Sequence, residues 1–458
     1  MLSYRSRIAS PDLYGSGDGD MVQHTPVLVI GAGPIGAVAA LAQARRGRTV
    51  VVLEASPAAA AKRFAGELLH PRALRALADA GAPLPPELGV PVPGFSVFVD
   101  GHTHALDYPD APGRTLPFAD LVAHLRTALR AHPQITLLDG WRVTSICGQA
   151  VTARTPDGTA KLTSETIIDA GGRNSPGRRA LDLSADLERL SLMAGLELHG
   201  VTLPFEGRGH VVLAPHGPAL IYRIGPDRIR VCLDVPSPWR RSWQTRLGPA
   251  YADALPPGLR DPILAELDAG RVEWAVNGVR ARTCFGRPGL ALVGDAAGVV
   301  HPMTAVGMTL GFADALALAD ATSLESWAAA RAADDRVPAL LATALYEIFA
   351  VDRPAPRALR AAVFDLWRSP HLRDRTMRFL AADDTSLPRF VGTGVQLVAR
   401  ATAHLARGPA PLLTAARVAG LVRWLLADAV PRPMQLPGLR VGATPFAAER
   451  RAVLMEVS

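Results

Sequence analysis

The hydrophobic pattern near the start of the chain predicts a strand, a tight turn, a helix and a second strand. Residues 27–30 (VLVI) and 49–53 (TVVVL) are short β-branched runs. A glycine-rich turn follows the first run, and the small-residue stretch AVAALAQARRG then leads to the second. Short apolar runs bounded by turn residues are typical of buried parallel strands, and small residues let a helix pack closely against them. We therefore expect a βαβ unit here.

Later parts of the chain follow other patterns. Residues 92–108 and about 185–280 alternate apolar and polar positions between Gly- and Pro-rich turns, which predicts a sheet. From about residue 335 to 430 the apolar spacing becomes helical. The first two dozen residues are polar, rich in Gly and Asp, and lack the apolar core of a signal peptide, so we expect a disordered extension there. No uninterrupted apolar stretch is long enough to span a bilayer.

Composition indicates a folded, arginine-rich protein. Of the 458 residues, 49% are hydrophobic and 20% are charged, which argues against disorder and permits two or three domains. The net charge is +7, almost all of it from arginine, since Lys62 and Lys161 are the only lysines. No recognition helix or zinc-finger pattern accompanies this charge, so we expect no nucleic-acid partner. An anionic membrane surface is the partner that the charge favours.

The three cysteines carry neither a disulfide framework nor a metal site. Cys147, Cys232 and Cys284 stand far apart, without a C-x-x-C pair and without a histidine at metal-ligand spacing. We expect a reducing, cytoplasmic setting and no bound metal.

The glycine-rich turn has the spacing of a dinucleotide-binding fingerprint. Gly31 permits the tight turn, Gly33 lets the backbone approach a pyrophosphate, and Gly36 lets helix and strand pack closely. The N-terminus of the following helix would face the phosphates. Glu54 ends the second strand about twenty residues on, where a carboxylate can accept the ribose hydroxyls. The sequence thus predicts a dinucleotide site.

A second, distant motif favours FAD over NAD. Residues 290–297 (LALVGDAA) form a buried strand that ends in Gly-Asp, and in flavoprotein hydroxylases the equivalent of Asp295 holds the ribityl chain of FAD. Between the two motifs, residues 167–178 (IIDAGGRNSPGR) occupy the place of the A-D-G-x-x-S-x-x-R motif of these flavoproteins. Here Gly171 replaces the motif's aspartate, and Asp169 lies two residues earlier. Because this region helps to receive the pyridine nucleotide in hydroxylases, the electron donor stays open.

Several further segments resemble the squalene epoxidases. Residues 63–71 (RFAGELLHP) are similar to their R-x-x-G-E-L-L-Q-P, and residues 301–309 (HPMTAVGMT) to their H-P-L-T-G-G-G-M-T. Residues 220–224 (LIYRI) with 230–234 (RVCLD), and 344–349 (ALYEIF), agree as well. The resemblance runs from about residue 26 to 430, without the N-terminal membrane segment of the animal enzymes. It implies FAD contacts from these residues: Glu54, Arg63, Arg126, Asp295, Gly307 and Met308.

The resemblance also implies an α/β architecture, the p-hydroxybenzoate-hydroxylase-type fold. We expect a doubly wound, Rossmann-like FAD-binding domain of the glutathione-reductase type, an inserted β-sheet substrate domain and a C-terminal helical region. The expected bounds are 25–91, 115–182 and 284–335 for the FAD-binding domain, 92–114 and 183–283 for the substrate domain, 336–432 for the helical region, and 1–24 and 433–458 for the extension and the tail.

The activity implied is that of an FAD-dependent monooxygenase. Reduced flavin would activate O2 as a C4a-hydroperoxide and pass one oxygen atom to a lipophilic alkene or isoprenoid, with electrons from NAD(P)H, directly or through a partner flavin reductase. An aromatic hydroxylase or a flavin-dependent reductase of the same fold stays open, as does a flavin-binding protein without turnover. A halogenase is disfavoured because no W-x-W-x-I-P segment is present.

Two candidate pocket residues depart from the squalene pattern. His70 stands in the position of the family's glutamine, and Phe95 in that of its tyrosine. We expect the hydrogen bond between those two side chains to be lost, which leaves another isoprenoid, a polyene or a lipophilic aromatic open as the substrate.

The end of the chain offers two Arg-containing helical stretches, residues 391–407 and 412–430. Each is too short or too charged to span a bilayer. Their apolar faces either pack on the protein's own core or form a platform that lies on the inner face of the membrane.

Overall fold

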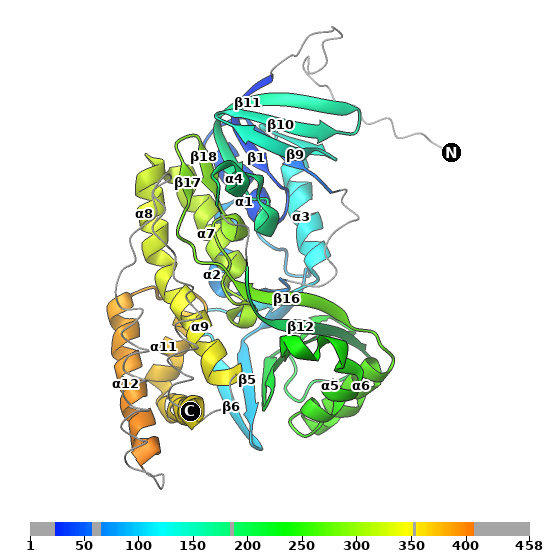
Figure 1. The fold of residues 1–458 in the computed structure, drawn as a ribbon, viewed down its shortest axis with the longest axis vertical. Helices are drawn as coiled ribbons and strands as arrows, with labels where there is room; N and C mark the ends of the chain where they lie inside the picture. The colour runs from blue at the N-terminus through cyan, green and yellow to red at the C-terminus, as the bar shows by residue number, and fades with distance from the viewer. Residues whose placement is uncertain (1–22, 57–65, 184–186, 351–353, 407–458) are drawn as a thin grey trace.

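The computed structural model describes residues 23–56, 66–183, 187–350 and 354–406, and Figure 1 shows their arrangement. The expected βαβ unit is present, built from β1 (Gln23–Ile30), α1 (Pro34–Ala44) and β2 (Val50–Glu54). These strands lie in a mainly parallel sheet in the order β17-β18-β11-β1-β2-β8. Its other strands are β8 (Ile135–Asp139), β11 (Gly158–Asp169), β18 (Leu290–Leu292) and, antiparallel at the edge, β17 (Gly286–Arg287).

Alternate side chains of β1 pack against two different layers, one on each face of the first sheet. Val27 and Val29 pack with α1 in a core that also takes residues from α2 (Pro71–Asp79), α3 (Phe118–Ala131), α7 (Gly307–Asp320) and α8 (Leu324–Asp334). Leu28 and Ile30 pack toward β9 (Arg142–Cys147) and β10 (Ala150–Thr155), which extend antiparallel from β11. Both faces of β1 are therefore buried, as its continuous apolar run requires. One layer is helical and the other is largely a β-meander, which α4 (Pro176–Ala180) accompanies.

The second sheet has seven strands in the order β16-β12-β15-β14-β13-β5-β6. Two segments supply them, inside the expected ranges 92–114 and 183–283. The strands are β5 (Gly94–Val99), β6 (His102–Asp107), β12 (Glu188–His199), β13 (Gly209–Ala214), β14 (Gly217–Gly225), β15 (Arg228–Val235) and β16 (Glu273–Val279). A small third sheet joins β3 (Leu68–Leu69), β7 (Gly113–Thr115) and β4 (Val90–Val92) and contacts β14 of the second sheet.

The prediction of strands throughout residues 185–280 was wrong for its centre. Residues 237–268 form a short 3-10 turn, η3 (Ser237–Arg241), and two helices, α5 (Trp243–Ala252) and α6 (Pro257–Asp268). Leu247, Tyr251, Leu259 and Ile263 are fully buried against the outer face of the sheet. Within each helix the two residues are four positions apart, so they lie on one face of the helix. This apolar spacing indicates a helix despite the Gly and Pro residues of the segment.

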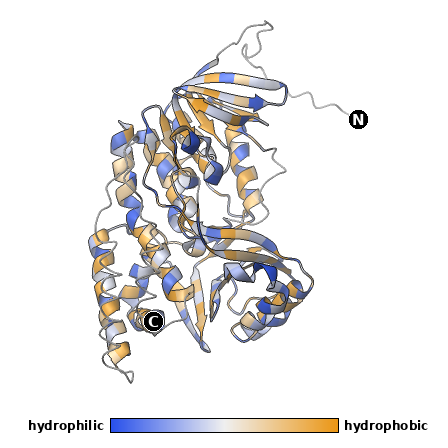
Figure 2. Cartoon of the chain, in the orientation of Figure 1, coloured by the Kyte–Doolittle hydropathy of each residue, from blue (hydrophilic) through white to orange (hydrophobic). Residues whose placement is uncertain are grey.

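Residues after 335 are helical, as expected, wherever the structure describes them. The helices are α9 (Arg336–Ala350), α10 (Pro354–Trp367), α11 (Pro370–Leu380) and α12 (Leu387–Ala406), and they lie beside β5 and β6 (Figure 1). Figure 2 shows hydrophobic and hydrophilic residues along α12. Its buried residues Leu397, Val398, Ala401 and Leu405 pack with α10 in one core, so this stretch covers the protein itself. The second predicted stretch, 412–430, lies outside the described residues. None of the helices in the described ranges is long and apolar enough to cross a membrane.

Candidate functional site

A cavity of about 900 Å³ lies between the carboxyl ends of the first sheet's parallel strands and one face of the second sheet. Ile30, Glu54, Ala170 and Val293, at or just after four strand ends, line it. Ligands of open α/β sheets bind outside the carboxyl ends of the strands. The position of the cavity is thus the one that a dinucleotide would take.

The glycine turn has the geometry that the fingerprint predicts. Gly31 has a φ of +94°, which favours glycine, and its N–H donates to the Leu53 carbonyl at 2.8 Å. A Cβ at Gly36 would lie 1.8 Å from the Gly31 oxygen, so no larger residue fits there. A Cβ at Gly33, in contrast, would meet no protein atom within 4 Å. Gly33 also caps α1 without a side-chain hydrogen bond, which leaves the first N–H groups of the helix for an anion.

Glu54 and Arg126 meet at this turn. Glu54 Oε2 accepts from the Ala32 N–H at 2.6 Å, and Arg126 Nη2 lies 3.2 Å from the same oxygen. Arg126, on α3, also donates from Nε to the Ala32 carbonyl at 3.3 Å. Its Nη1 is buried without a hydrogen-bond partner among the described residues, 3.7 Å from Asp139 Oδ1. A phosphate or ribose oxygen in the cavity would satisfy this orphan donor.

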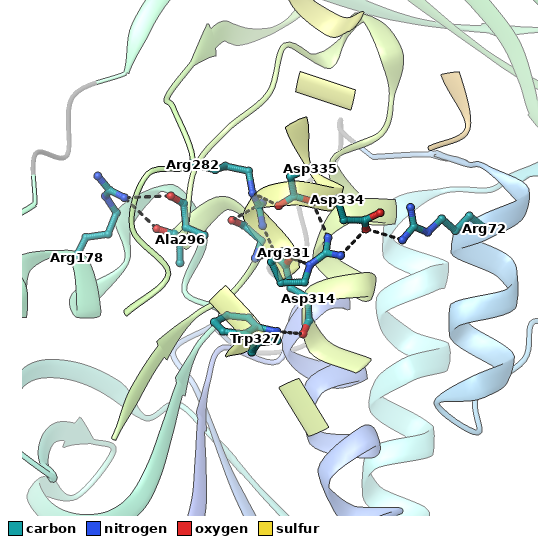
Figure 3. Close-up of polar contacts among 11 residues, drawn as sticks. Arg72, Arg178, Arg282, Ala296, Asp314, Trp327, Arg331, Asp334 and Asp335 are labelled. Atoms are coloured by element: carbon teal, nitrogen blue, oxygen red, sulfur yellow. Dashed lines mark hydrogen bonds and ion pairs between the residues drawn. The ribbon is translucent and has the colours of Figure 1, made fainter. Parts of the chain in front are cut away.

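The Gly294–Asp295 turn is held by a buried ionic network, shown in Figure 3. Asp314 Oδ2, on α7, accepts from the Gly294 N–H at 2.8 Å, and Arg282 Nη1 donates to the Gly294 carbonyl at 3.2 Å. Arg282 and Arg331 both pair with Asp314, and Arg331 and Arg282 also pair with Asp335. Burial acts to raise the pKa of Asp314, but the two arginines outweigh it and lower the pKa. We call this network the clamp. It leaves Asp295 on the cavity wall, 3.5 Å from Arg173 Nε.

This network was not predicted from the sequence. Its residues come from a loop after β16, from α7 and from the end of α8, so no local motif contains them. The spacing of Arg331 to Asp334 and Asp335, three and four residues apart on one helix, was the available signal.

The altered segment around Asp169 is explained by close packing. Asp169 is fully buried and accepts from the N–H groups of Gly171 and Gly177 and from Ser175 Oγ. A Cβ at Gly171 would lie 2.8 Å from Asp169 Oδ1. A side chain at 171 would therefore require the Asp169 carboxylate to shift. Asp169 closes the turn into α4 and is not on the cavity wall.

A second helix N-terminus opens onto the same cavity. Gly307 and Met308 line it at the start of α7, which has no side-chain cap. Met308 lies against Gly66, where a Cβ would be 3.4 Å from the methionine Cε. Gly31, Gly33, Glu54, Arg126, Asp295, Gly307 and Met308 all border this one space, with Gly36 packed behind the turn. Arg63 lies outside the described residues.

The face of the second sheet that meets the cavity is apolar in its middle. Leu220 and Tyr222 of β14, Cys232 of β15, Met193 of β12 and Ala275 of β16 line it, and we call these five residues the apolar strip. Beside the strip, Arg230 pairs with Glu67 through two bonds of 2.8 and 2.9 Å. Both side chains of this pair are almost fully buried. The pair ties the segment before β3 to the second sheet, and the sequence analysis did not predict it.

Comparisons with known proteins agree with this arrangement. The family model of squalene epoxidases matches residues 160–387, and the model of FAD dependent oxidoreductases matches residues 26–88. Squalene epoxidase erg1 of Aspergillus fumigatus is 28% identical over 382 residues, covering 74% of this chain and 78% of that protein. Squalene epoxidase 3 of Arabidopsis thaliana is 29% identical over 373 residues, covering 74% and 70%.

Solved structures share the fold. p-Nitrophenol 4-monooxygenase PnpA from Pseudomonas putida has a TM-score of 0.66 at 21% identity, covering 79% of this chain and 99% of that one. PqsL from Pseudomonas aeruginosa, in complex with 2-aminobenzoylacetate, has a TM-score of 0.60 at 24% identity, covering 79% and 100%. The chain is a squalene-epoxidase-like, FAD-dependent monooxygenase.

The residues of this monooxygenase fit FAD. The open space at Gly33, the orphan Nη1 of Arg126 and the uncapped starts of α1 and α7 are suited to a ligand that carries phosphates and carbonyl oxygens. Glu54, Arg126, Asp295 and the backbone of Gly307 and Met308 are the groups that would hold it.

The structure places neither His70 nor Phe95 on the cavity wall of the monooxygenase. His70 is fully buried, and its Nε2 lies 2.7 Å from the Thr304 carbonyl. A carbonyl only accepts, so Nε2 carries the proton and Nδ1 accepts from Tyr108 Oη at 2.6 Å. Burial lowers the pKa of His70 to about 4, which keeps the ring neutral.

The hydrogen bond between the side chains at positions 70 and 95 is absent, as expected, but His70 keeps a tyrosine as its partner. Tyr108 bonds His70, while the Phe95 ring packs edge-on against Tyr108 with centroids 6.0 Å apart. A tyrosine from a different strand end takes the partner role, and single-residue comparison at position 95 could not detect it.

Proposed function

We propose that this monooxygenase transfers one oxygen atom from O2 to a carbon–carbon double bond of a lipophilic, isoprenoid-like substrate. The observation that carries the proposal is the continuity of the cavity, which runs from the turns that would hold FAD to the apolar strip of the second sheet. A substrate lying on the strip would be next to the cofactor without leaving the protein. The relatives named squalene epoxidases support the substrate class.

When bound, reduced FAD supplies the oxygen chemistry. The chain's own residues position and shield it. The N–H groups at the start of α7 can stabilise negative charge on the part of the cofactor that lies there. The apolar strip excludes water from the reacting atoms, which prevents loss of activated oxygen to solvent.

The test is incorporation of labelled oxygen. FAD-loaded protein is supplied with reductant, 18O2 and a panel of terpene alkenes, prenyl alcohols and lipophilic aromatics, and the products are measured by mass spectrometry. One labelled atom in an epoxide supports the proposal. Label in a phenol would instead identify an aromatic hydroxylase, and reduced, unlabelled products would identify a reductase.

We propose further that electrons reach the flavin from a nicotinamide through a partner reductase. The buried role of Asp169 supports this, because the segment that receives pyridine nucleotide in hydroxylases is here folded around that carboxylate. Bleaching of the flavin by NADPH alone at catalytic rates would refute the two-component version.

We propose that the protein works in the cytoplasm and contacts the membrane peripherally through residues after 406. A lipophilic substrate and the arginine excess support such contact. Because α12 packs on the core, the test compares the full chain with a chain ending at Ala406 in co-sedimentation with anionic liposomes. Equal sedimentation of the two chains would contradict the proposal.

A further inference from the structure

One buried hydrogen-bond donor on the cavity wall lacks an acceptor. His301 lines the cavity and is only 2% exposed. It comes just before the short 3-10 turn η5 (Pro302–Thr304), and its Nδ1 accepts a hydrogen bond from the Met303 N–H at 3.2 Å. A backbone N–H only donates, so in the neutral ring Nδ1 is unprotonated and Nε2 carries the hydrogen. Nε2 is buried and has no hydrogen-bond partner among the described residues.

The imidazole ring of His301 is neutral and fixed in place. Burial lowers the pKa of His301 to about 3, so the ring carries no charge at neutral pH. The ring of Tyr346, on α9, packs on it with the centroids 4.3 Å apart and the planes at 40°. The backbone of Met303 thus holds one edge of the imidazole, and Tyr346 covers one of its faces. Support of this kind makes Nε2 a preorganised donor.

His301 differs from the other cavity residues that have a buried nitrogen without a hydrogen bond. Among the described residues these are Arg126 and Arg173. Arg126 Nη1 lies 3.7 Å from a carboxylate oxygen of Asp139. Arg173 Nε lies 3.5 Å from a carboxylate oxygen of Asp295. His301 Nε2 has no such neighbour within the described ranges, and a buried N–H without any acceptor is costly enough to call for a ligand or a bound water.

The wall around His301 lies between two groups that would hold the cofactor. Asp295 comes six residues before it, and Gly307, at the uncapped start of α7, comes six residues after it. Residues 299–303 all line the same cavity. A flavin held at its ribityl chain by Asp295 and at its ring by the start of α7 would lie along this stretch. The isoalloxazine ring carries two carbonyl oxygens, which are hydrogen-bond acceptors.

The relatives indicate that the acceptor belongs to the cofactor and not to the substrate. The histidine stands at the same place in the H-P-L-T-G-G-G-M-T segment of the squalene epoxidases. The curated relatives are named for squalene, which is a hydrocarbon and offers no acceptor. A donor common to this chain and those enzymes needs an acceptor that is also common to them, and the flavin ring is one.

We propose that His301 is a catalytic residue that donates a hydrogen bond from Nε2 to a carbonyl oxygen of the isoalloxazine ring of FAD. The inference requires FAD in the cavity but does not require the proposed substrate. Reduction by two electrons with uptake of one proton, both supplied by the nicotinamide through the reductase, adds one negative charge to the ring. A hydrogen bond to a charged acceptor is stronger than one to a neutral acceptor, so His301 favours the reduced state. The histidine keeps its own proton in this step.

Two substitutions separate the roles of the two ring nitrogens. In His301→Asn the amide oxygen can take the place of Nδ1 and accept from the Met303 N–H, but no group reaches the position of Nε2. In His301→Gln the amide NH2 can take the place of Nε2, while the Met303 N–H loses its acceptor. Asparagine therefore preserves a structural role of the histidine, and glutamine preserves a donor to the cofactor.

The measurement is an anaerobic redox titration of the FAD-loaded protein against a reference dye. In His301→Asn the ratio of reduced to oxidised flavin at a fixed potential should fall about tenfold, which corresponds to about 30 mV for a two-electron couple. His301→Gln should stay within about threefold of the wild type. His102→Asn, the same change at the exposed start of β6, should leave the ratio unchanged.

Three results of the titration would overturn the inference. An unchanged ratio in His301→Asn would make a bound water the partner of Nε2. A higher ratio in His301→Asn would give the hydrogen bond the wrong sign. Equal falls in the asparagine and glutamine variants would show that the packing of the ring on Tyr346 matters and the donor does not.

Infrared spectroscopy of the wild type guards against a folding defect in the variants. The protein is loaded with FAD that carries 13C at the two ring carbonyl carbons. A carbonyl stretching band below that of flavin in an aprotic solvent supports the inference, and two bands at the aprotic frequencies contradict it. Labelled epoxide in the 18O2 experiment with an unchanged redox ratio in His301→Asn would refute this inference alone. The expected fall in the ratio without labelled product would refute the proposed function alone.

Discussion

Asp314 and Asp234 are both buried carboxylates, the first bonded to the Gly294 turn and the second on the cavity wall, yet their surroundings are opposite. Asp314 faces two arginines and a backbone N–H, and the arginines lower its pKa despite complete burial. Asp234 faces two neutral donors and no cation among the described residues, and burial raises its pKa to about 6. Burial is shared, so the compensating charge decides the difference. The first carboxylate is saturated and clamps a turn, whereas the second is held by neutral groups.

The largest expected effect is that of removing the charge at Asp314. Asp314→Asn leaves Arg282 and Arg331 buried with too little negative charge, which typically costs about 3–5 kcal/mol. Urea unfolding of the FAD-free protein measures the loss, and FAD affinity should fall as well because a neutral amide replaces the carboxylate that anchors the Gly294 N–H. A loss below about 1 kcal/mol would show that the network is not a clamp.

The next effect is a pH dependence carried by Asp234. Its folded pKa of about 6 lies above its ordinary value of 3.8, so the folded protein holds the proton more tightly than the unfolded chain. The stability contribution is therefore complete below about pH 4 and is lost as the pH rises through 6. Each pKa unit is worth about 1.4 kcal/mol, so wild type should lose roughly 3 kcal/mol relative to Asp234→Asn between pH 4 and 7. Parallel stability curves for the two proteins would contradict the raised pKa.

Asp295→Ala separates binding from clamping. The side chain is about one-third exposed and ends on the cavity wall, so its removal should leave the stability of the FAD-free protein nearly unchanged. FAD affinity should fall by roughly 10- to 100-fold, the worth of a hydrogen bond to a charged group. Equilibrium titration of the FAD-free protein checks this. Full flavin occupancy at limiting FAD would mean that the Gly294–Asp295 turn has been assigned wrongly.

The smallest effect is expected at Asp320, which lies on the same helix as Asp314 and forms an exposed ion pair with Arg46. Asp320 accepts from Arg46 at 2.6 Å, but both side chains are about half exposed. Asp320→Asn should change the free energy of unfolding by less than about 1 kcal/mol. Comparing this change with that of Asp314→Asn tests whether the clamp stabilises the protein because its ion pairs are buried or because they are ion pairs. A loss as large as that of Asp314→Asn would remove the distinction.

The cofactor side of the site was largely predictable because its information is local. Gly31, Gly33 and Gly36 each serve a backbone requirement within one turn, and Glu54 follows on the adjacent strand at a fixed spacing. Arg126 and Met308 came only through resemblance, since an arginine or a methionine on a helix has no signature of its own. The parallel sheet and the helical C-terminal region were predictable from the spacing of hydrophobic residues, which is also local information.

The remainder depended on contacts between distant segments. Ser191, Asp234 and Asn277 look like ordinary polar positions of three strands until the sheet order β16-β12-β15 brings them together. Tyr108 replaces a lost partner of His70 from outside the motif. The helices α5 and α6 were missed because Gly and Pro residues were given more weight than a four-residue apolar spacing.

The order of the chain has a consequence for biosynthesis. The fingerprint at residues 31–36 leaves the ribosome early, but β18 joins the first sheet only with residues 290–292, and the Asp295 and Gly307 side of the cavity follows it. The clamp at Gly294 then waits for Arg331 and Asp335. The whole second sheet is synthesised between the fingerprint and β18. If these residues hold the flavin as proposed, we expect a nascent chain to retain it only after nearly three-quarters of its length has emerged, so that cofactor loading would report that both sheets are complete.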